Sequence, residues 1–412
     1  MVKMLTTHTL EVDDTDAAVR EILEKLDIRH NLLKNAVGLL FCYLDFIKSG
    51  GMEAVCRALP FDVVGCTTLG AAAHEGMGDI ILSLTVLTSD DVEFHSGLSE
   101  PLTGDEENRI SRCYREAAAP LQIPSSLILI FTPSLYNLAG DMVVGVLDRE
   151  SQGVPVFGTG ALDADTKIRT PKTIYGGTAY ADRMPILLLS GNLRPRFFID
   201  SVWKHDIHSQ KALVTGAEGN RMISVNGMPA AVYMKKIGFI TEEKLDMLFV
   251  FPLAIEQGKG APPNLCIIYT INGDGSLTCS ANIPPGSTLR LGCPGSGEVL
   301  TTAKNITDAV RREDGGEALL ICSCFSRSVI QANPRDEMEM IQSELKNSTP
   351  PYTFIYSGGE ICPVYDEKNG TVNQYHNYAI IACLLTEKND PGAAAQHGII
   401  AAGFQGSNRN EQ

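Results

Sequence analysis

The fold prediction rests on Val64-Gly65-Cys66-Thr67-Thr68-Leu69-Gly70, where a short apolar run ends in a turn of small residues. Two later stretches have the same layout, Phe157-Gly158-Thr159-Gly160-Ala161-Leu162-Asp163 and Tyr356-Ser357-Gly358-Gly359-Glu360-Ile361. Each begins with strand-forming residues and continues into glycine, which permits a tight turn without steric cost. We therefore expect three strands that each end in a glycine-rich turn.

The same order of elements surrounds each turn. Apolar periodicity predicts helix, strand, helix and strand before the turn, and another strand after it. The expected elements are Thr15–Leu26, Val37–Phe46, Met52–Leu59, Phe61–Val64 and Ile80–Leu87, then Asp105–Ala119, Ser126–Phe131, Ala139–Glu150, Val154–Phe157 and Arg183–Leu189, and finally Glu298–Arg312, Ala318–Cys324, Pro334–Leu345, Tyr352–Tyr356 and His376–Leu385. The repetition suggests internal duplication, although alternating α/β chains also produce similar orders by chance.

Between the second and third copies the sequence is rich in strands. Ile267–Ile271 and Leu277–Ala281 flank Asn272-Gly273-Asp274-Gly275, which is a strong hairpin signal. We therefore expect an α/β to α+β mixed fold. In it, repeated helix–strand–helix–strand–turn–strand units form mixed sheets covered by helices, with a β-rich middle segment.

Length and charge restrict the class of protein. The 412 residues predict two to three domains, and we expect a division into residues 1–215 and 216–412. The formal charge of −15 argues against nucleic-acid binding and against docking on anionic membranes, because both need a basic surface. No apolar run approaches the ~20 residues of a membrane helix, and the N-terminus has no signal-peptide pattern. With 11 cysteines and no Cys-x-x-Cys pair, we expect a cytoplasmic protein with reduced thiols.

Common enzyme motifs are absent from the sequence. Gly258-Lys259 lacks the rest of a phosphate-binding loop, and Gly158-x-Gly160 lacks the third glycine of a dinucleotide turn. His205-x-x-His208 has helical metal-ligand spacing, but two exposed histidines are the simpler interpretation. Cys66 lies in a turn where it could be a nucleophile, yet no neighbouring residue type supplies a base, so a structural thiol is expected.

The third turn combines several polar residue types. Glu360 follows Gly358-Gly359 at a strand end, and His376-Asn377 opens the next strand. Together with Arg327, which follows the Ala318–Cys324 strand, they could bind a ligand that carries an amine and a carboxylate. The alternative is that Glu360, His376 and Arg327 pair with one another as a buried structural network. After the second turn, a ligand site and a structural network are again the two alternatives, here for Asp163, Asp165 and Arg169.

These motifs, in this order, resemble the FIST family of sensory signal-transduction proteins over roughly residues 35–390. The matches include Val63–Thr68, Gly158–Asp163, Val214-Thr215, Asn226–Ala230, Asp274–Leu277, Cys324-Phe325-Ser326-Arg327, Gly359-Glu360-Ile361 and His376-Asn377. The sequence departs from the family pattern at Thr159, Asn226 and Tyr378. The resemblance implies a cytoplasmic sensory module that binds a small ligand, with amino acids or related metabolites the usual proposal. It implies ligand-binding roles for Arg327, Gly359, Glu360, His376, Asn377, Thr67, Gly158 and Asp163.

The resemblance also implies how the signal leaves the protein. FIST modules feed kinases, chemoreceptors or cyclic-dinucleotide enzymes, and the two FIST parts occupy nearly all of this chain. We therefore expect a stand-alone sensor that acts through a separate protein, without nucleic-acid binding, membrane insertion or a bound metal or cofactor. One alternative is a haem-based gas sensor with His376 or His205 as axial ligand. Others are an undescribed enzyme using Cys66 or the Glu360/His376 pair, and a purely structural role.

Overall fold

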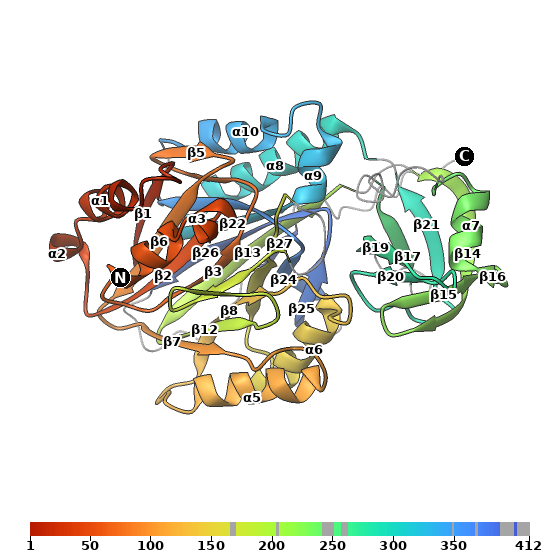
Figure 1. The fold of residues 1–412 in the computed structure, drawn as a ribbon, viewed down its shortest axis with the longest axis horizontal. Coiled ribbons are helices and arrows are strands. Elements are labelled where there is room, and N and C mark those ends of the chain that lie inside the picture. Colours follow the sequence, from red (N-terminus) through yellow and green to blue (C-terminus); the bar gives the residue numbers. More distant parts are fainter. Residues whose placement is uncertain are drawn as a thin grey trace.

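The computed structural model describes residues 1–164, 170–202, 206–240, 251–256, 263–292, 294–347, 350–366, 370–387 and 399–401. In these ranges the chain forms a body of three mixed sheets and a smaller β-sheet domain beside it (Figure 1). None of the helices described there combines the length and the apolar character needed to cross a membrane.

The body consists of three units with one order of elements. The first unit contains β1 (Lys3–Thr9), α1 (Thr15–Leu26), α2 (Ile28–Asn31), β2 (Asn35–Cys42), α3 (Asp45–Lys48), α4 (Gly51–Arg57), β3 (Val63–Thr67), β4 (Ala71–Ala73), β5 (Gly76–Gly78) and β6 (Leu82–Ser89). The second contains β7 (Glu93–Leu98), α5 (Glu106–Ala118), β8 (Ser125–Thr132), α6 (Gly140–Ser151), β9 (Val156–Gly160), β10 (Thr173–Tyr175), β11 (Thr178–Tyr180) and β12 (Pro185–Ser190). The third contains β13 (Leu193–Ser201), α8 (Ser296–Arg311), β22 (Ala318–Cys324), α9 (Phe325–Ile330), α10 (Asp336–Leu345), β23 (Tyr352–Ser357), β24 (Glu360–Asp366), β25 (Gly370–His376), β26 (Ala379–Glu387) and β27 (Ile399–Ala401). The expected repeated units and mixed fold are therefore confirmed.

Each unit builds its sheet around two parallel strands and one antiparallel strand. The parallel pairs are β2 with β3, β8 with β9 and β22 with β23, and β6, β12 and β26 run antiparallel beside them. Two helices cover the outer face of each sheet, α1 and α4, α5 and α6, or α8 and α10 (Figure 1). The inner faces of the three sheets meet in one apolar core. The amphipathic helices and the fully apolar strands follow from this arrangement, because the strands are covered on both faces.

The units are joined by an exchange of strands. After its glycine-rich turn, each unit sends a strand into the sheet of another unit: β4 pairs with β23, β24 pairs with β9, and β10 pairs with β3. The first unit thus extends the third sheet, the third extends the second, and the second extends the first. The exchange closes into a ring.

The smaller domain is inserted into the third unit, between β13 and α8. It contains β14 (Asp206–Glu218), β15 (Arg221–Val225), β16 (Met228–Pro229), α7 (Ala230–Lys236), β17 (Leu253–Glu256), β18 (Asn264–Cys266), β19 (Ile268–Ile271), β20 (Leu277–Cys279) and β21 (Thr288–Gly292). The hairpin expected around Asn272–Gly275 joins β19 to β20. Position 215/216, where a domain boundary is expected, lies inside the single strand β14.

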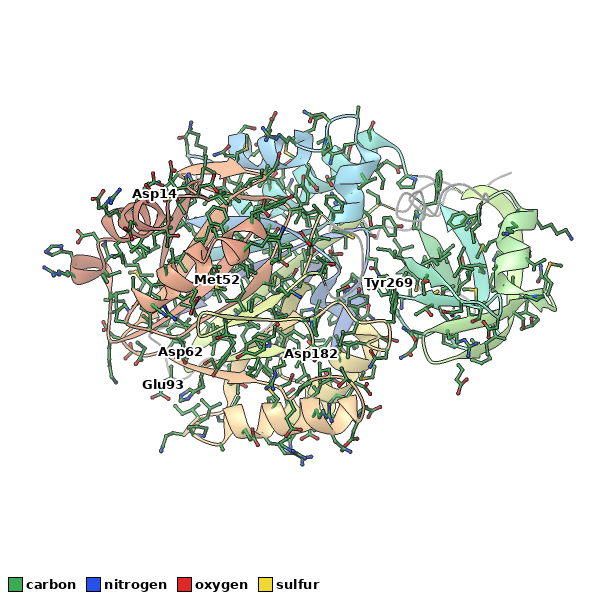
Figure 2. All side chains as sticks on the ribbon, viewed as in Figure 1. Asp14, Met52, Asp62, Glu93, Asp182 and Tyr269 are labelled. Carbon is green, nitrogen blue, oxygen red and sulfur yellow. The ribbon has the colours of Figure 1, made fainter. Side chains whose placement is uncertain are left out.

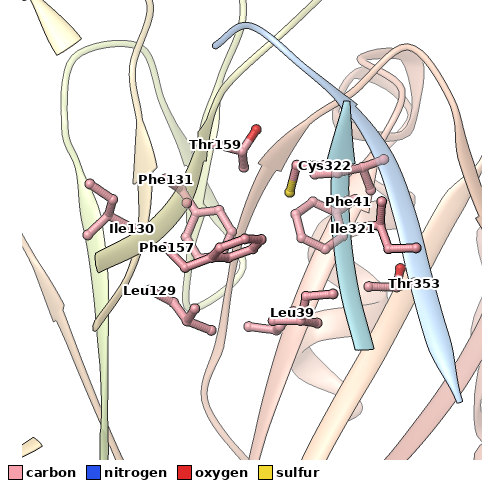
Figure 3. Close-up of a pocket in the computed structure, with 13 residues that line it drawn as sticks. Leu39, Phe41, Leu129, Ile130, Phe131, Phe157, Thr159, Ile321, Cys322 and Thr353 are labelled. Atoms are coloured by element: carbon pink, nitrogen blue, oxygen red, sulfur yellow. The ribbon is translucent and has the colours of Figure 1, made fainter. Parts of the chain in front are cut away.

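The axis of the body is tightly packed. Figure 3 shows Leu39 and Phe41 of β2, Leu129 and Phe131 of β8, and Cys322 of β22 around an apolar cavity of about 20 Å³. This volume corresponds to about one water molecule, and an apolar cavity of that size stays dry. We therefore expect the functional site elsewhere in the fold.

Candidate functional site

The three glycine-rich turns converge next to the axis. The Gly160 amide donates to the carbonyl of Gly359 and the Gly358 amide donates to that of Gly160, both at 2.9 Å. The Leu162 amide donates to the carbonyl of Thr67 at 3.0 Å. The predicted residues Thr67, Gly158, Asp163, Gly359 and Glu360 are therefore gathered from three distant parts of the sequence.

Glu360 is completely buried at the start of β24. Its Oε1 accepts a hydrogen bond from the Ser357 hydroxyl at 2.5 Å, whereas Oε2 has no hydrogen-bond partner among the described residues. Burial raises the pKa of Glu360 well above its ordinary value, although Ser357, the Ala379 amide, Arg327 and the Cys324 thiol lower it. The carboxyl group consequently stays protonated at pH values where an exposed glutamate is ionised.

A small cavity lies at the carboxyl ends of β8, β9 and β23. Its lining comes from the loop after β8, the start of α6, the turn glycines Gly160 and Gly358, and the rings of Tyr269 and Tyr375. It measures about 20 Å³ and so has room for about one water molecule. In sheets with parallel strands this edge is where ligands bind, because the loops there leave a crevice.

Two tyrosines close the cavity and are hydrogen-bonded to each other. Tyr269 belongs to β19 of the inserted domain, and Figure 2 shows it on the side of that domain that faces the body. Burial raises the pKa of Tyr269 to about 12 and that of Tyr375 above its ordinary value, and the nearby Glu360 adds to both shifts. Both phenols are therefore neutral hydrogen-bonding groups, and Glu360 lies close behind them.

The Tyr375 ring occupies a slot between two glycines. A Cβ atom on Gly359 would lie 2.2 Å from the Tyr375 hydroxyl, and one on Gly140 would lie 2.2 Å from its ring. Gly359 also has a φ of 137°, which side chains rarely adopt. Position 359 thus requires glycine for two reasons: its positive φ disfavours any side chain, and the Tyr375 ring leaves no room for a Cβ atom.

We expect Gly359→Ala to destabilise the body by about 1–3 kcal/mol or more, because both the backbone strain and the collision with Tyr375 oppose it. The measurement is urea unfolding followed by circular dichroism. Gly273→Ala is the matched control, since a Cβ atom there meets nothing within 4 Å. Equal stabilities of the two variants would contradict the packing argument.

Asn377 connects the body to the inserted domain. Its Nδ2 donates to the carbonyl of Leu265 at 2.9 Å and to the Ser280 hydroxyl at 3.0 Å, while its Oδ1 accepts from Tyr375 at 3.4 Å. The next residue, Tyr378, is buried and has a φ of 57°, a strained value for a tyrosine. Of the predicted pair His376-Asn377, Asn377 therefore forms hydrogen bonds that depend on the position of the inserted domain.

His376 lies directly opposite Glu360 in the antiparallel pairing of β24 with β25. No hydrogen bond between the two side chains is found; Nε2 of His376 is instead 3.1 Å from the carbonyl oxygen of Cys362. Burial lowers the pKa of His376 to about 4. The ring is therefore neutral at pH 7 and donates its Nε2 proton to that carbonyl, a bond that a haem iron at Nε2 would break.

Arg327 forms a buried network of its own. Its guanidinium bonds to Glu337 at 2.6 Å, to the Thr302 hydroxyl at 2.9 Å and to the Val299 carbonyl at 3.0 Å. Both Arg327 and Glu337 are completely buried. In this structure Arg327 therefore joins α8, α9 and α10, and a ligand carboxylate would have to displace one of these partners.

The remaining predicted residues have identifiable local roles. Thr67 exchanges hydrogen bonds with the backbone of Lys172, and Oδ1 of Asp163 accepts the Ala164 amide at 2.7 Å. Gly158 allows β8 and β9 to pack closely, because a Cβ atom there would lie 2.4 Å from the Ile130 carbonyl oxygen. Cys66 is buried, and burial raises the pKa of its thiol above the ordinary value, which leaves it a poor nucleophile.

Some expectations concern residues outside those described. His205, Asp165 and Arg169 belong to this group, as does the side chain of His208. Within the described ranges no cluster of three or more His, Cys, Asp or Glu side chains has the arrangement of a metal site.

The residues predicted from the sequence do not include Tyr269, Tyr375, Ser280 or the loop after β8. Tyr375 directly precedes His376-Asn377, so its position in the motif was the available signal. Tyr269 has no such signal, because it reaches the site only through the placement of the inserted domain.

The fold and site define a class of protein: three interlocked α/β units with an inserted β-sheet domain whose Tyr269 closes a small cavity at the glycine-rich turns. Family models identify it further. The FIST N domain matches residues 36–228 and the FIST C domain matches residues 229–363. The chain belongs to the FIST family, as the sequence motifs implied.

Similarity to other proteins is otherwise distant. No curated protein matches the chain. Among solved structures, the crystal structure of a cyanuric acid hydrolase from A. caulinodans is similar, with 9% identity and a TM-score of 0.36 over 95% of this chain and 100% of that one. FIST domains are sensory domains of signal transduction, which supports a sensory role for this chain.

Proposed function

We propose that this protein senses a small ligand, an amino acid or a related metabolite, at the cavity between the body and the inserted domain. The observation that carries the proposal is the buried Oε2 of Glu360, which has no hydrogen-bond partner among the described residues. A buried polar atom without a partner costs roughly 1–3 kcal/mol, so proteins seldom keep one without a use.

The cavity must enlarge to admit such a ligand. At about 20 Å³ it is closed, and Tyr269 of the inserted domain forms part of its wall. Movement of Tyr269 away from Tyr375 widens the cavity and strains the Asn377 bonds to Leu265 and Ser280. Ligand binding is thereby coupled to the position of the inserted domain, which is what a sensor needs. A change in that position is the signal that a separate signalling protein would detect.

The roles within the site follow from its charges. The protonated Glu360 donates a hydrogen bond to an acceptor on the ligand, or accepts an ammonium group if the ligand removes its proton. Asn377 and the two tyrosines supply further neutral donors and acceptors. We do not assign the ligand carboxylate to Arg327, whose guanidinium is bonded to Glu337.

A thermal-shift screen against amino acids and related metabolites tests the proposal. A ligand at a hundredfold excess over its Kd stabilises the protein by about 2.7 kcal/mol. We expect Glu360→Ala to remove the shift, and the exposed Glu24→Ala on α1 to retain it. A ligand whose affinity is the same in Glu360→Ala and in the native chain would place its site elsewhere and contradict the assignment.

A further inference from the structure

The corner between β25 and β26 contacts the inserted domain on one side and Arg327 on the other. It consists of Asn377 and Tyr378 alone, since β25 ends at His376 and β26 begins at Ala379. The two strands belong to different sheets, β25 to the second and β26 to the third. A displacement of this corner therefore affects both sheets.

The inserted domain holds the corner through polar and apolar contacts. Asn377 donates to the Leu265 carbonyl and to the Ser280 hydroxyl. Tyr378 is completely buried and belongs to one apolar cluster with Leu265 and Ile267 of the inserted domain. The position of Tyr378 therefore depends on the position of the inserted domain.

The body holds the same corner through the carbonyl of Tyr378. That oxygen accepts the Val202 amide at 3.3 Å and an N–H of the Arg327 guanidinium at 3.4 Å. Arg327 in turn bonds to the Thr302 hydroxyl of α8 and to Glu337 of α10. A continuous line of contacts thus runs from the inserted domain to the two outer helices of the third unit.

The backbone at Tyr378 can change its conformation. Its φ of 57° lies in the left-handed region, and such a strained value persists only where the surrounding contacts hold it. If the inserted domain moves away, the ring loses its apolar contacts there. Relaxation to a negative φ then rotates the carbonyl of Tyr378 away from Arg327. Tyr378 therefore has a second, unstrained conformation that breaks the contact with Arg327.

We propose that Tyr378 is a conformational switch that couples the position of the inserted domain to the Arg327 network beneath α8 and α10. Movement of the domain releases Tyr378, and loss of its carbonyl from Arg327 loosens the packing of the two helices. Weakening of the network loosens the domain in turn, because coupling between two sites is reciprocal. The inference goes beyond the proposed function, since this coupling is a property of the chain without a ligand.

Hydrogen exchange of the whole chain, followed by mass spectrometry, tests the coupling because exchange rates report local opening. Thr302→Val removes the buried hydroxyl that Arg327 binds on α8. We expect β18 and β20 of the inserted domain to exchange at least about fivefold faster in this variant, which is the lower end of typical coupling between sites. Thr301→Val is the matched control, because Thr301 is exposed on the same helix and its hydroxyl donates to the Gly297 carbonyl.

The opposite direction is tested from another contact of the inserted domain. Asp141→Ala on α6 removes the acceptor of the Asn282 amide and so loosens the domain without changing Tyr378. We expect α8 and α10 to exchange faster in this variant by a similar factor. In a Tyr378→Gly background this effect should disappear, because glycine keeps a positive φ without strain and its carbonyl then stays on Arg327. In a Tyr378→Phe background, which retains the ring and the strain, the effect should persist.

Three results would overturn the proposal. They are unchanged exchange of the inserted domain in Thr302→Val, equal effects in the Tyr378→Gly and Tyr378→Phe backgrounds, and an equal acceleration in α1, which would indicate general destabilisation. The comparison of Thr302→Val with Thr301→Val leaves Tyr378 in place, so it decides the coupling even where Tyr378→Gly does not fold. No ligand enters these measurements, so their failure is distinct from a failure of the proposed function.

Discussion

Replacing Glu360 with glutamine should make the protein increasingly stable, relative to the native chain, as the pH rises above about 4.5. The folded protein holds the pKa of Glu360 well above that ordinary value through burial. At a pH between the ordinary pKa of the unfolded chain and the raised pKa of the folded protein, Glu360 has lost its proton in the unfolded chain but keeps it in the folded one. The native stability therefore falls with rising pH, by up to about 1.4 kcal/mol per pH unit from this one group.

Glutamine removes this dependence because it does not titrate. Its carbonyl can still accept the Ser357 hydroxyl, and any cost of an unpaired amide is the same at each pH. The measurement is urea unfolding of both proteins at pH 5, 6, 7 and 8, with the exposed Glu24→Gln as the control. Parallel curves for Glu360→Gln and the native chain would show that Glu360 is ionised in the fold.

Replacing Arg327 with methionine should cost about 3–5 kcal/mol of folding free energy, because it leaves Glu337 buried without its cation. The double variant Arg327→Met with Glu337→Leu should recover most of that loss, since neither charge then remains. Urea unfolding of the single and double variants measures the coupling.

The control is Arg115→Met, which removes an exposed partner of Glu150 and should change stability little. If the single and the double variant lose the same free energy of unfolding, the ion pair with Glu337 is not what holds Arg327 in place. The guanidinium would then be available to a ligand carboxylate, as the sequence motif alone implied.

The sequence predicts the units well and their assembly poorly. The glycine-rich turns and the hairpin at Asn272–Gly275 are local features, so turn chemistry and periodicity are enough to find them. The pairing of Ala71 with Ile355 is not local, because nothing in either segment identifies its partner. Register between such distant strands depends on the whole apolar core.

The site shows the same division. Glu360 is predictable as a carboxylate at a strand end, whereas its complete burial and the lack of a partner for its Oε2 among the described residues depend on tertiary packing. Arg327 is predictable as a cation that needs an acid, yet the choice of Glu337 over Glu360 depends on how α10 packs against β22. Motifs therefore identify the residues, and tertiary packing decides their partners.

The ring of exchanged strands has a consequence for how the protein can be divided. The two family models meet at residues 228 and 229, inside the inserted domain, and so divide the chain into two matched segments. A fragment ending there would lack β24 beside β9, and β4 would lack β23. Each fragment would expose edge strands with unpaired backbone N–H and C=O groups, and such edges readily pair with other chains and aggregate. The two family domains are thus halves of a single cooperative folding unit, and expression trials should keep them together.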